Sequence, residues 1–229
     1  MPTATPDIPV FMCTWKRPHL FASTIQQLAS QRGVNAQLHV WNNNPDIVRV
    51  LDDFVGSHEL QIPVSVVHSD RNIGSIARFH LARDHFDGSE FVAFIDDDQK
   101  FNEEFLETLW SNRVTGGVAA TYARTILKGE SYIHRGHPKP GDPVNYCGPG
   151  GMILDSSCLL VEELHDIPGE FWMFDDLWFS YIMNHRLRAP MYKSTASVSM
   201  IDKDNDTSHL LYDQKSAFLE YLRGHGWNV

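Results

Sequence analysis

Three consecutive aspartates, Asp96, Asp97 and Asp98, directly follow the apolar run at residues 91–95. Such a run is typical of a buried strand, and parallel sheets carry their ligand chemistry at the carboxyl ends of the strands. Adjacent carboxylates repel one another unless a cation neutralises them, and hard divalent cations take oxygen ligands and bind phosphates. The triplet therefore predicts a Mg²⁺ or Mn²⁺ site that handles a phosphate group. The alternative is a solvated acidic turn without a ligand.

A second acidic pair, Asp175 and Asp176, opens a helix-like segment at residues 174–188. Both carboxylates then lie in the first helical turn, where the helix dipole stabilises their ionised form. A hydroxyl nucleophile needs an ionised carboxylate within hydrogen-bond reach to accept its proton, so the pair is a candidate general base. Two acids that only cap the helix are the alternative. The nearby Trp172 is suited to pack against the C–H face of a sugar ring, although core packing explains it equally.

The elements that must position these acids follow the alternating pattern of an α/β layered fold. Strands are predicted at residues 10–14, 38–41, 64–67 and 91–95. Helices are predicted to begin near Pro18, after a cap at Asp46, over residues 74–86, and after a cap at Asn102. The second half predicts strands at 116–123 and 152–154, a loop at 128–149, helices at 174–188 and 215–222, and a polar loop at 202–207.

The composition limits the classes of function. With 229 residues, 42% of them hydrophobic, the chain is predicted to form one domain. Its 19 basic and 29 acidic residues give a net charge of -10, which argues against a nucleic-acid partner. No apolar run approaches the ~20 residues of a membrane span, so a lipid-linked partner must be met at the surface. The spacing of the three cysteines and the absence of a secretory leader indicate a cytoplasmic protein, free or peripheral to the inner face of the membrane.

Four segments, in this order, resemble glycosyltransferases of the GT-A fold, closest to family 2. They are the strand at 10–14 with Lys16-Arg17-Pro18, residues 72–78, the aspartate triplet, and residues 174–178. The resemblance covers nearly the whole chain. It implies a single GT-A domain over residues 1–229, a Rossmann-like α/β/α sandwich with a mostly parallel central sheet. Residues of about 1–100 would form the nucleotide-binding half and about 101–229 the acceptor-binding half.

The resemblance also implies roles for the donor-side residues. Asp98 would be the direct metal ligand, Asp96 would face the ribose or a metal-bound water, and Asp97 would support them. The nucleotide would contact Thr14, Arg17, Asn42, Asn43, Asn72, Gly74, Arg78, Asp96 and Asp97. The family's commoner Asp-Asp-Gly-Ser loop is replaced here by residues 42–45, Asn-Asn-Asn-Pro, which leaves the base open. A helix start at Gly74 with Arg78 in solvent is the alternative at that motif.

On the acceptor side, the resemblance makes Asp176 the catalytic base and places Asp175, in place of the family's Glu, against a sugar. Gly150 and Gly151 would lie beside the donor sugar, or else form an ordinary tight turn, and Trp172 would be an acceptor platform. His209 would reach the metal or the diphosphate. Residues 202–206 begin like a calcium loop, but Thr207 replaces its glycine and Asp213 its glutamate, so we exclude an EF-hand.

The sequence therefore predicts a metal-dependent glycosyltransferase that uses Mn²⁺ or Mg²⁺ and a nucleotide-sugar donor, with a UDP-sugar favoured. The acceptor would be the hydroxyl of a glycan, lipid-linked or small molecule, in glycan or polysaccharide biosynthesis. A single displacement with inversion needs only one base and one metal. Two alternatives stay open: a non-catalytic nucleotide- or glycan-binding module, and a sugar nucleotidyltransferase. The latter needs a glycine-rich loop after the first strand, and residues 13–18 contain no glycine.

Overall fold

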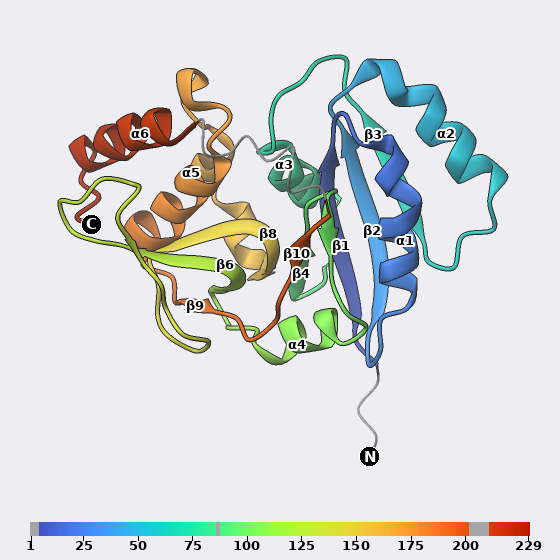
Figure 1. Ribbon diagram of the computed structural model, residues 1–229, viewed down its shortest axis with the longest axis horizontal. Coiled ribbons are helices and arrows are strands. Elements are labelled where there is room, and N and C mark those ends of the chain that lie inside the picture. Colours follow the sequence, from blue (N-terminus) through green and yellow to red (C-terminus); the bar gives the residue numbers. More distant parts are fainter. Residues whose placement is uncertain (1–4, 86–87, 202–210) are drawn as a thin grey trace.

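The first half of the chain forms the parallel part of the central sheet (Figure 1). The computed structural model describes residues 5–85, 88–201 and 211–229. Its first strands are β1 (Asp7–Thr14), β2 (Asn35–Asn42), β3 (Val64–His68) and β4 (Phe91–Phe94), which pair in the order β3-β2-β1-β4. All three of these pairings are parallel, so the strands end at the same edge of the sheet. The four predicted strands are confirmed, with β1 and β2 longer than expected.

The helices that cover this part begin at slightly different residues from those predicted. They are η1 (Pro18–Leu20), α1 (Phe21–Ala29), η2 (Pro45–Ile47), α2 (Val48–Ser57), α3 (Ala77–Asp84) and α4 (Phe105–Ser111). The cap predicted at Asp46 is wrong, because Pro45 takes the first helical position and the Asn44 side chain accepts the hydrogen bond from the Asp46 amide. The cap predicted at Asn102 is also wrong, because α4 starts after Glu104 without a side-chain cap.

The second half inserts an antiparallel ribbon beside β4. The strands are β6 (Val118–Ile126), β7 (Arg135–Gly136), β8 (Tyr146–Asp155) and β9 (Met191–Lys193), and β8 lies between β4 and β6. Among the pairings of this sheet within the described residues, four are parallel and three antiparallel, so the predicted mostly parallel α/β sheet is confirmed.

The strand β8 is much longer than the sequence predicts. Residues 146–149, predicted as loop, form its first part, and the Gly150-Gly151 pair lies inside it instead of forming a turn before it. A register shift between Ala120 and Tyr122 of β6 accommodates Gly151, whose φ of +82° is in the left-handed region. Strand pairing with β6 therefore overrides the loop signal of the glycines and prolines.

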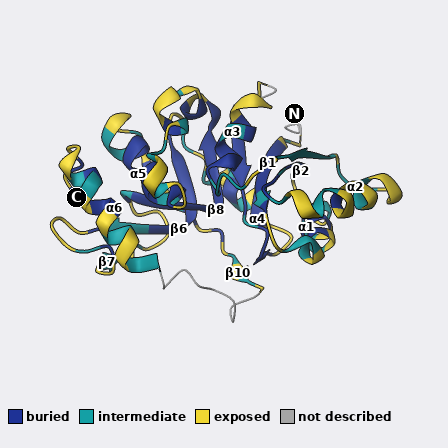
Figure 2. Cartoon of the chain, turned by 90° about the horizontal axis from the view of Figure 1, so that it is seen from above, coloured by how far each residue is buried: buried dark blue, intermediate teal, exposed yellow. Residues whose placement is uncertain are grey.

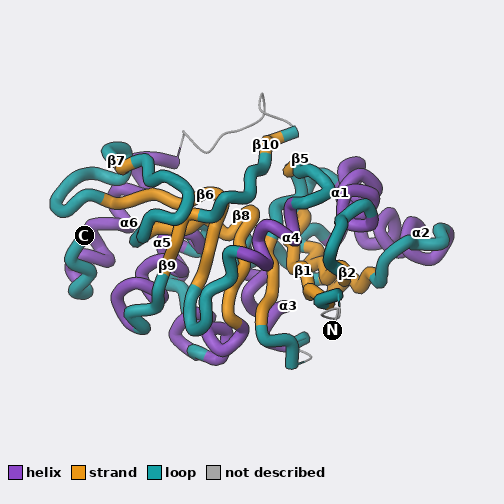
Figure 3. Tube along the Cα trace, turned by 90° about the horizontal axis from the view of Figure 1, so that it is seen from below, coloured by secondary structure: helices purple, strands orange, loops and turns teal. Residues whose placement is uncertain are grey.

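Two helices close the second half. They are α5 (Asp175–Tyr181), which continues as a π-helical turn (Ile182–Arg186), and α6 (Tyr212–Gly224). The short strands β5 (Gln99–Lys100) and β10 (Ser199–Met200) pair antiparallel (Figure 3), and β5 follows β4 closely in the chain. The predicted loop at 202–207 and His209 lie outside the described residues.

The sheet is the buried centre of the molecule, and the exposed residues lie mainly on the outer faces of the helices and on the loops (Figure 2). One apolar cluster includes Phe79, Phe94 and Phe179 on the side of α3 and α5. A second includes Leu28 and Leu106 on the side of α1 and α4. In the described part of the chain, none of the helices has the length and apolar character needed to cross a bilayer.

Candidate active site

A cleft of about 850 Å³ opens where β1, β2 and β4 end. Many of the predicted residues line it: Thr14, Arg17, Asn43, Asn72, Gly74, Arg78, Asp96, Asp97, Asp98 and Trp172. The lining does not include Asn42, Gly150, Gly151, Asp175 or Asp176. Residues to which the sequence assigned no individual role also line it: Cys13, Trp15, Lys16, His19, Ser75, Met173 and Met200. The parallel register produces this gathering, because it sets Thr14 opposite Asn42 and Phe11 opposite Phe94.

Asp97 and Asp98 are held by Arg17 from the loop after β1. One guanidinium nitrogen of Arg17 lies 3.1 Å from Oδ1 of Asp97, and the other lies 3.1 Å from Oδ2 of Asp98. Thr14 donates a hydrogen bond of 2.9 Å to the second oxygen of Asp97. Burial raises the pKa of Asp98 to about 6, repulsion from Asp96 adds to the shift, and Arg17 opposes it. Because both oxygens of Asp97 are engaged within the protein, this residue fixes the loop.

Asp96 is paired with Arg78, which is buried in α3. Arg78 donates a 2.6 Å hydrogen bond to Oδ1 of Asp96, and its Nε lies 3.7 Å from Oδ2 of Asp175. Burial by itself would lower the pKa of Arg78, but the two carboxylates raise it above its ordinary value. The alternative that Arg78 lies in solvent is therefore wrong. This one guanidinium joins the two acidic clusters, which are 79 residues apart from Asp96 to Asp175.

Asp175 is buried on the same side as Arg78. Its Oδ1 accepts a hydrogen bond of 2.5 Å from the Ser75 hydroxyl, whereas its Oδ2 has no hydrogen-bond donor among the described residues. Burial raises the pKa of Asp175 to about 6, although Arg78 opposes the shift. This carboxylate is therefore poised to change its protonation state near neutral pH.

Asp176 has a different environment from its neighbour. Its Oδ2 forms an ion pair with Lys215 of α6 and accepts a 2.5 Å hydrogen bond from the Tyr146 hydroxyl. Its Oδ1 accepts from the Leu177 amide at 2.8 Å. Burial by itself would raise the pKa of Asp176, but Lys215 and these hydrogen bonds hold it below its ordinary value. Asp176 is thus ionised. The sequence did not identify its two side-chain partners, Lys215 and Tyr146.

Gly74 is fixed by the fold. Its φ is +83°, and a Cβ there would lie 2.7 Å from the ring of Trp172 and 2.8 Å from its carbonyl oxygen. Only glycine tolerates both conditions, and the left-handed conformation also explains why α3 begins at Ala77 and not at Gly74. Trp172 is thereby placed on the wall of the cleft, where 36% of its surface is exposed.

Asn42 and Asn43, at the end of β2, have different surroundings. Asn43 lines the cleft, donates to the Gly74 carbonyl at 2.9 Å and accepts from the Ile73 amide at 3.1 Å. Asn42 is fully buried and hydrogen-bonds to the Asn44 carbonyl and to His68. The structure therefore does not bring the Asn42 side chain to the cleft, because the alternation of β2 places it on the same buried face as Leu38 and Val40.

Gly150 makes room for the first aspartate of the triplet. A Cβ at this position would overlap Oδ2 of Asp96 and come within 2.6 Å of Nε2 of Gln99. Gln99 in turn accepts a hydrogen bond of 3.0 Å from the Asp96 amide. Gly150 thus contacts the site from beneath the carboxylate, although it is not part of the cleft surface.

The donor set of the cleft suits a hard cation. Asp96 and Asp98 are carboxylates within one turn of chain, and oxygen ligands of this kind are the ones that Mg²⁺ and Mn²⁺ take, usually together with substrate phosphates. Within residues 5–85, 88–201 and 211–229, the protein offers no group of three or more His, Cys, Asp or Glu side chains arranged for a metal. The described residues would therefore supply only part of the ligand shell of a metal ion. The predicted ligand His209 lies outside these ranges.

Comparisons with known proteins agree with this arrangement. The model of the family described as Glycosyl transferase family 2 matches residues 10–176 of the chain. A search of curated protein sequences finds no match. Among solved structures, S. aureus TarS 1–349 in complex with UDP-GlcNAc is 16% identical, with a TM-score of 0.56 over 82% of this chain and 55% of that one.

Two further structures have similar folds. The mannosyltransferase PcManGT from Pyrobaculum calidifontis, in complex with GDP-Man and Mn²⁺, is 12% identical, with a TM-score of 0.64 over 96% of this chain and 64% of that one. GalNAc-T7 with UDP, GalNAc and Mn²⁺ is 9% identical, with a TM-score of 0.61 over 86% and 43%. The present chain thus spans less than two thirds of each of these proteins.

Proposed function

Because this chain belongs to glycosyltransferase family 2 and is a glycosyltransferase of the GT-A fold, we propose that it moves a sugar from a nucleoside diphosphate donor to an acceptor hydroxyl with inversion. The donor in this proposal is a UDP-sugar, and the cation is Mn²⁺ or Mg²⁺. The acceptor is the hydroxyl of a glycan, lipid-linked or small molecule, in glycan or polysaccharide biosynthesis. The division into a nucleotide-binding half at about 1–100 and an acceptor half at about 101–229 belongs to the same proposal.

The position of Arg78 carries the proposal. Transfer requires the donor diphosphate and the proton acceptor to lie next to one another, and Arg78 lies within 4 Å of both Asp96 and Asp175. Asp96 belongs to the predicted metal cluster and Asp175 to the predicted base pair. Had the two clusters been on opposite faces of the sheet, no single substrate pair could contact both. Their proximity supports a reaction between a phosphate-bearing donor and a hydroxyl.

The donor half supplies charge of both signs to the cleft. In this proposal, Asp96 and Asp98 hold the divalent cation, which when bound neutralises the charge that develops on the departing diphosphate. Lys16 and Arg17 line the same cleft and add positive charge beside the phosphates. The bound UDP-GlcNAc of TarS and GDP-Man of PcManGT support a nucleoside diphosphate as the leaving group.

The acceptor half supplies the base. In this proposal, the ionised Asp176 carboxylate accepts the proton of the acceptor hydroxyl while the hydroxyl oxygen bonds to the anomeric carbon. The bond between that carbon and the diphosphate breaks, and its electron pair leaves with the nucleoside diphosphate. Lys215 keeps Asp176 ionised, whereas Asp175 orients a sugar hydroxyl from beside Arg78. Trp172 is the platform for the sugar ring.

The test measures release of nucleoside diphosphate from a panel of nucleotide sugars, with Mn²⁺, in two variants. Asp98→Ala should lose both transfer and the Mn²⁺-dependent part of nucleotide binding, whereas Asp176→Asn should lose transfer and keep nucleotide binding. Asp53→Ala, which removes an exposed carboxylate on α2, is the matched control and should keep both. Full activity of either site variant would refute the assignment.

The same assay separates the alternatives. Tight nucleotide binding without release of diphosphate from any donor would indicate a non-catalytic binding module. Release of pyrophosphate from a nucleoside triphosphate and a sugar phosphate would indicate a nucleotidyltransferase. The loop after β1 argues against the latter, because residues 13–18 contain no glycine to wrap a triphosphate.

A further inference from the structure

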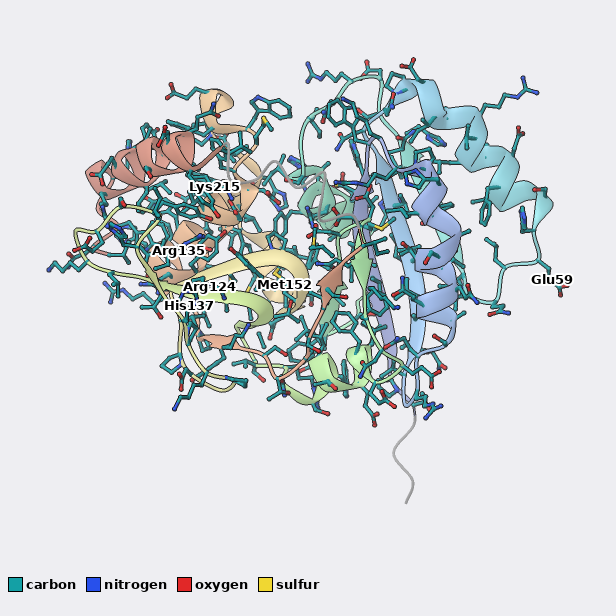
Figure 4. All side chains as sticks on the ribbon, viewed as in Figure 1. Glu59, Arg124, Arg135, His137, Met152 and Lys215 are labelled. Atoms are coloured by element: carbon teal, nitrogen blue, oxygen red, sulfur yellow. The ribbon has the colours of Figure 1, made fainter. Side chains whose placement is uncertain are left out.

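Three cations in the second half of the chain have no acidic partner among the residues that the structure describes. Of the lysines and arginines within the described ranges, only Arg124, Arg135 and Lys193 are neither exposed nor within 4.0 Å of a carboxylate. They lie on the neighbouring strands β6, β7 and β9, and Figure 4 shows Arg124 and Arg135 over this part of the sheet. A partly buried charge without a counter-ion is unfavourable. An anion is therefore the missing partner.

Strand register places the three residues along β6, with Arg124 between the other two. The β6–β7 register sets Arg135 opposite Ile126, two residues after Arg124, and the β6–β9 register sets Lys193 opposite Ala120. Lys193 has its pKa lowered by burial and by the positive charge of Arg124. Their hydrogen bonds go to backbone carbonyls, from Arg124 to Ala123 and from Lys193 to Thr121, and these do not neutralise charge.

Tyrosine rings hold the two guanidinium groups in place. The Arg135 guanidinium carbon lies 3.9 Å from the ring centroid of Tyr132, and its buried Nη1 has no hydrogen-bond partner within residues 5–85, 88–201 and 211–229. The Arg124 guanidinium carbon lies 4.6 Å from the ring centroid of Tyr122. A guanidinium stacked on a ring can donate its remaining N–H groups to phosphate or carboxylate oxygens. In Arg124, one of these groups already donates to the Ala123 carbonyl.

The strand β8 connects this cluster to the reaction site. The Tyr146 ring lies 5.9 Å from the Arg135 guanidinium carbon, and the Tyr146 hydroxyl donates to Asp176. Further along the same face, a Cβ on Gly148 would meet Tyr122, and a Cβ on Gly150 would meet Asp96. Alternate residues of a strand are only about 7 Å apart. The side chain of Tyr146 thus lies between Arg135 and Asp176, and Asp96 lies roughly 14 Å further along β8, next to Gly150.

We propose that Arg124, Arg135 and Lys193 form an anion subsite that selects acceptors carrying a phosphate or carboxylate group near the accepting hydroxyl. The inference rests on the proposed function, since it names the chemical class of the acceptor. The protein has a net charge of -10, which repels anions at long range. The positive charges of Arg124, Arg135 and Lys193 oppose this repulsion where the acceptor binds. These residues are separate from Arg17 and Arg78 of the donor cleft.

A binding experiment tests the subsite without any reaction. Inorganic phosphate, glucuronate and glucose are titrated into the full chain, and the arginine Nε–Hε resonances are followed by NMR. The Arg124 and Arg135 resonances should shift saturably with phosphate or glucuronate and not with glucose. Arg135→Gln should weaken binding at Arg124 about tenfold. Arg113, which is exposed and stacked 4.3 Å from the Trp110 ring, should show no saturable shift, and Arg113→Gln should leave binding unchanged.

A transfer experiment then uses matched acceptors: methyl glucoside, its 6-phosphate and methyl glucuronide. Arg135→Gln should raise KM about tenfold for the acceptor whose anion is recognised, and leave KM for methyl glucoside and the donor unchanged. Arg124→Gln and Lys193→Gln give the same test if circular dichroism shows that Arg135→Gln does not fold. The acceptor whose KM responds identifies the anion as phosphate or carboxylate.

The two experiments distinguish a failure of the anion subsite from a failure of the proposed function. Saturable binding at Arg124 and Arg135 without transfer to any acceptor would keep the subsite and reject the proposed function. Shifts at these arginines no larger than at Arg113, or equal KM values for charged and neutral acceptors, would overturn the subsite.

Discussion

The arginines of the donor cleft and those of the face formed by β6, β7 and β9 have opposite electrostatic surroundings. In the cleft, Arg17 and Arg78 are each within 4 Å of two carboxylates. On the face formed by β6, β7 and β9, Arg124 and Arg135 are stacked on tyrosines, and no carboxylate in the described part of the chain is that close to them. In the first region two guanidinium groups face four carboxylates, so negative charge is in excess, as the proposed cation site requires. The second is unbalanced and is complete only when an anion binds.

The same contrast appears between two adjacent residues. Asp175 is buried beside Arg78 with its pKa raised to about 6, whereas Lys215 holds the pKa of Asp176 below its ordinary value. One helical step separates the side chains, but their partners come from α3 in one case and from α6 in the other. Environment, and not residue type, assigns them different protonation behaviour. The following predictions test these differences, beginning with the largest effect.

Replacing Arg78 should have the largest effect, because it leaves the buried Asp175 and the partly exposed Asp96 without their shared counter-charge. We expect Arg78→Met to reduce kcat/KM by about 100-fold or more and to lower the free energy of unfolding by roughly 3–5 kcal/mol. Steady-state kinetics and urea unfolding measure the two quantities. Arg83→Met on the same helix is the control, since its partner Asp84 is exposed and the pair is weak. Similar results for the two variants would contradict the bridging role.

Replacing Lys215 should move the pH dependence of transfer. Without the ammonium group, the pKa of Asp176 should rise, so Lys215→Met should shift the acidic limb of the kcat/KM profile to higher pH. The loss should be about 10- to 100-fold on the acid side and smaller at high pH, where Asp176 is ionised in both proteins. Lys215→Arg should restore most of the activity. An unchanged acidic limb in Lys215→Met would show that Asp176 is not the titrating base.

Adding a methyl group at position 150 should displace Asp96 without removing any charge. We expect Gly150→Ala to lower kcat/KM about tenfold and to weaken Mn²⁺-dependent nucleotide binding, because a shift of about 1 Å at such a group is costly. Gly169→Ala is the matched control, since a Cβ there meets nothing within 4 Å. Equal binding in both variants would show that the position of Asp96 is not limiting.

The smallest expected effect is on stability against pH. The folded pKa of Asp175 is about 6, above its value of 3.8 in an unfolded chain, so the folded state binds more protons in this window. This residue should therefore make the protein less stable as pH rises from about 4 to 6, by up to about 2 kcal/mol. Urea unfolding of Asp175→Asn between these pH values should lack that contribution. An identical slope in both proteins would contradict the shift.

Local signals in the sequence determined which segments carry the chemistry. The apolar run before Asp96 required a strand that ends at the triplet, and the periodicity after Asp175 required a helix with both acids in its first turn. The order of the motifs identified the fold family. Each motif is a short run of residues, and its strand or helix character depends mainly on neighbours a few residues away. The boundaries failed where partners are remote, as in β8, whose first half reads as loop until β6 pairs with it.

Tertiary structure alone decided which side chain neutralises which. Arg17 reaches across 80 residues to Asp97, Arg78 joins Asp96 to Asp175, and Lys215 pairs with Asp176 from the last helix. It also placed Asn42 on the buried face of β2 and left Arg124 and Arg135 without a carboxylate partner among the described residues. The physical reason is that the periodicity of hydrophobic residues and the residue preferences of turns reflect only neighbours a few residues away in the sequence. Charge pairing in a folded protein instead depends on strand register and helix placement, which no local pattern records.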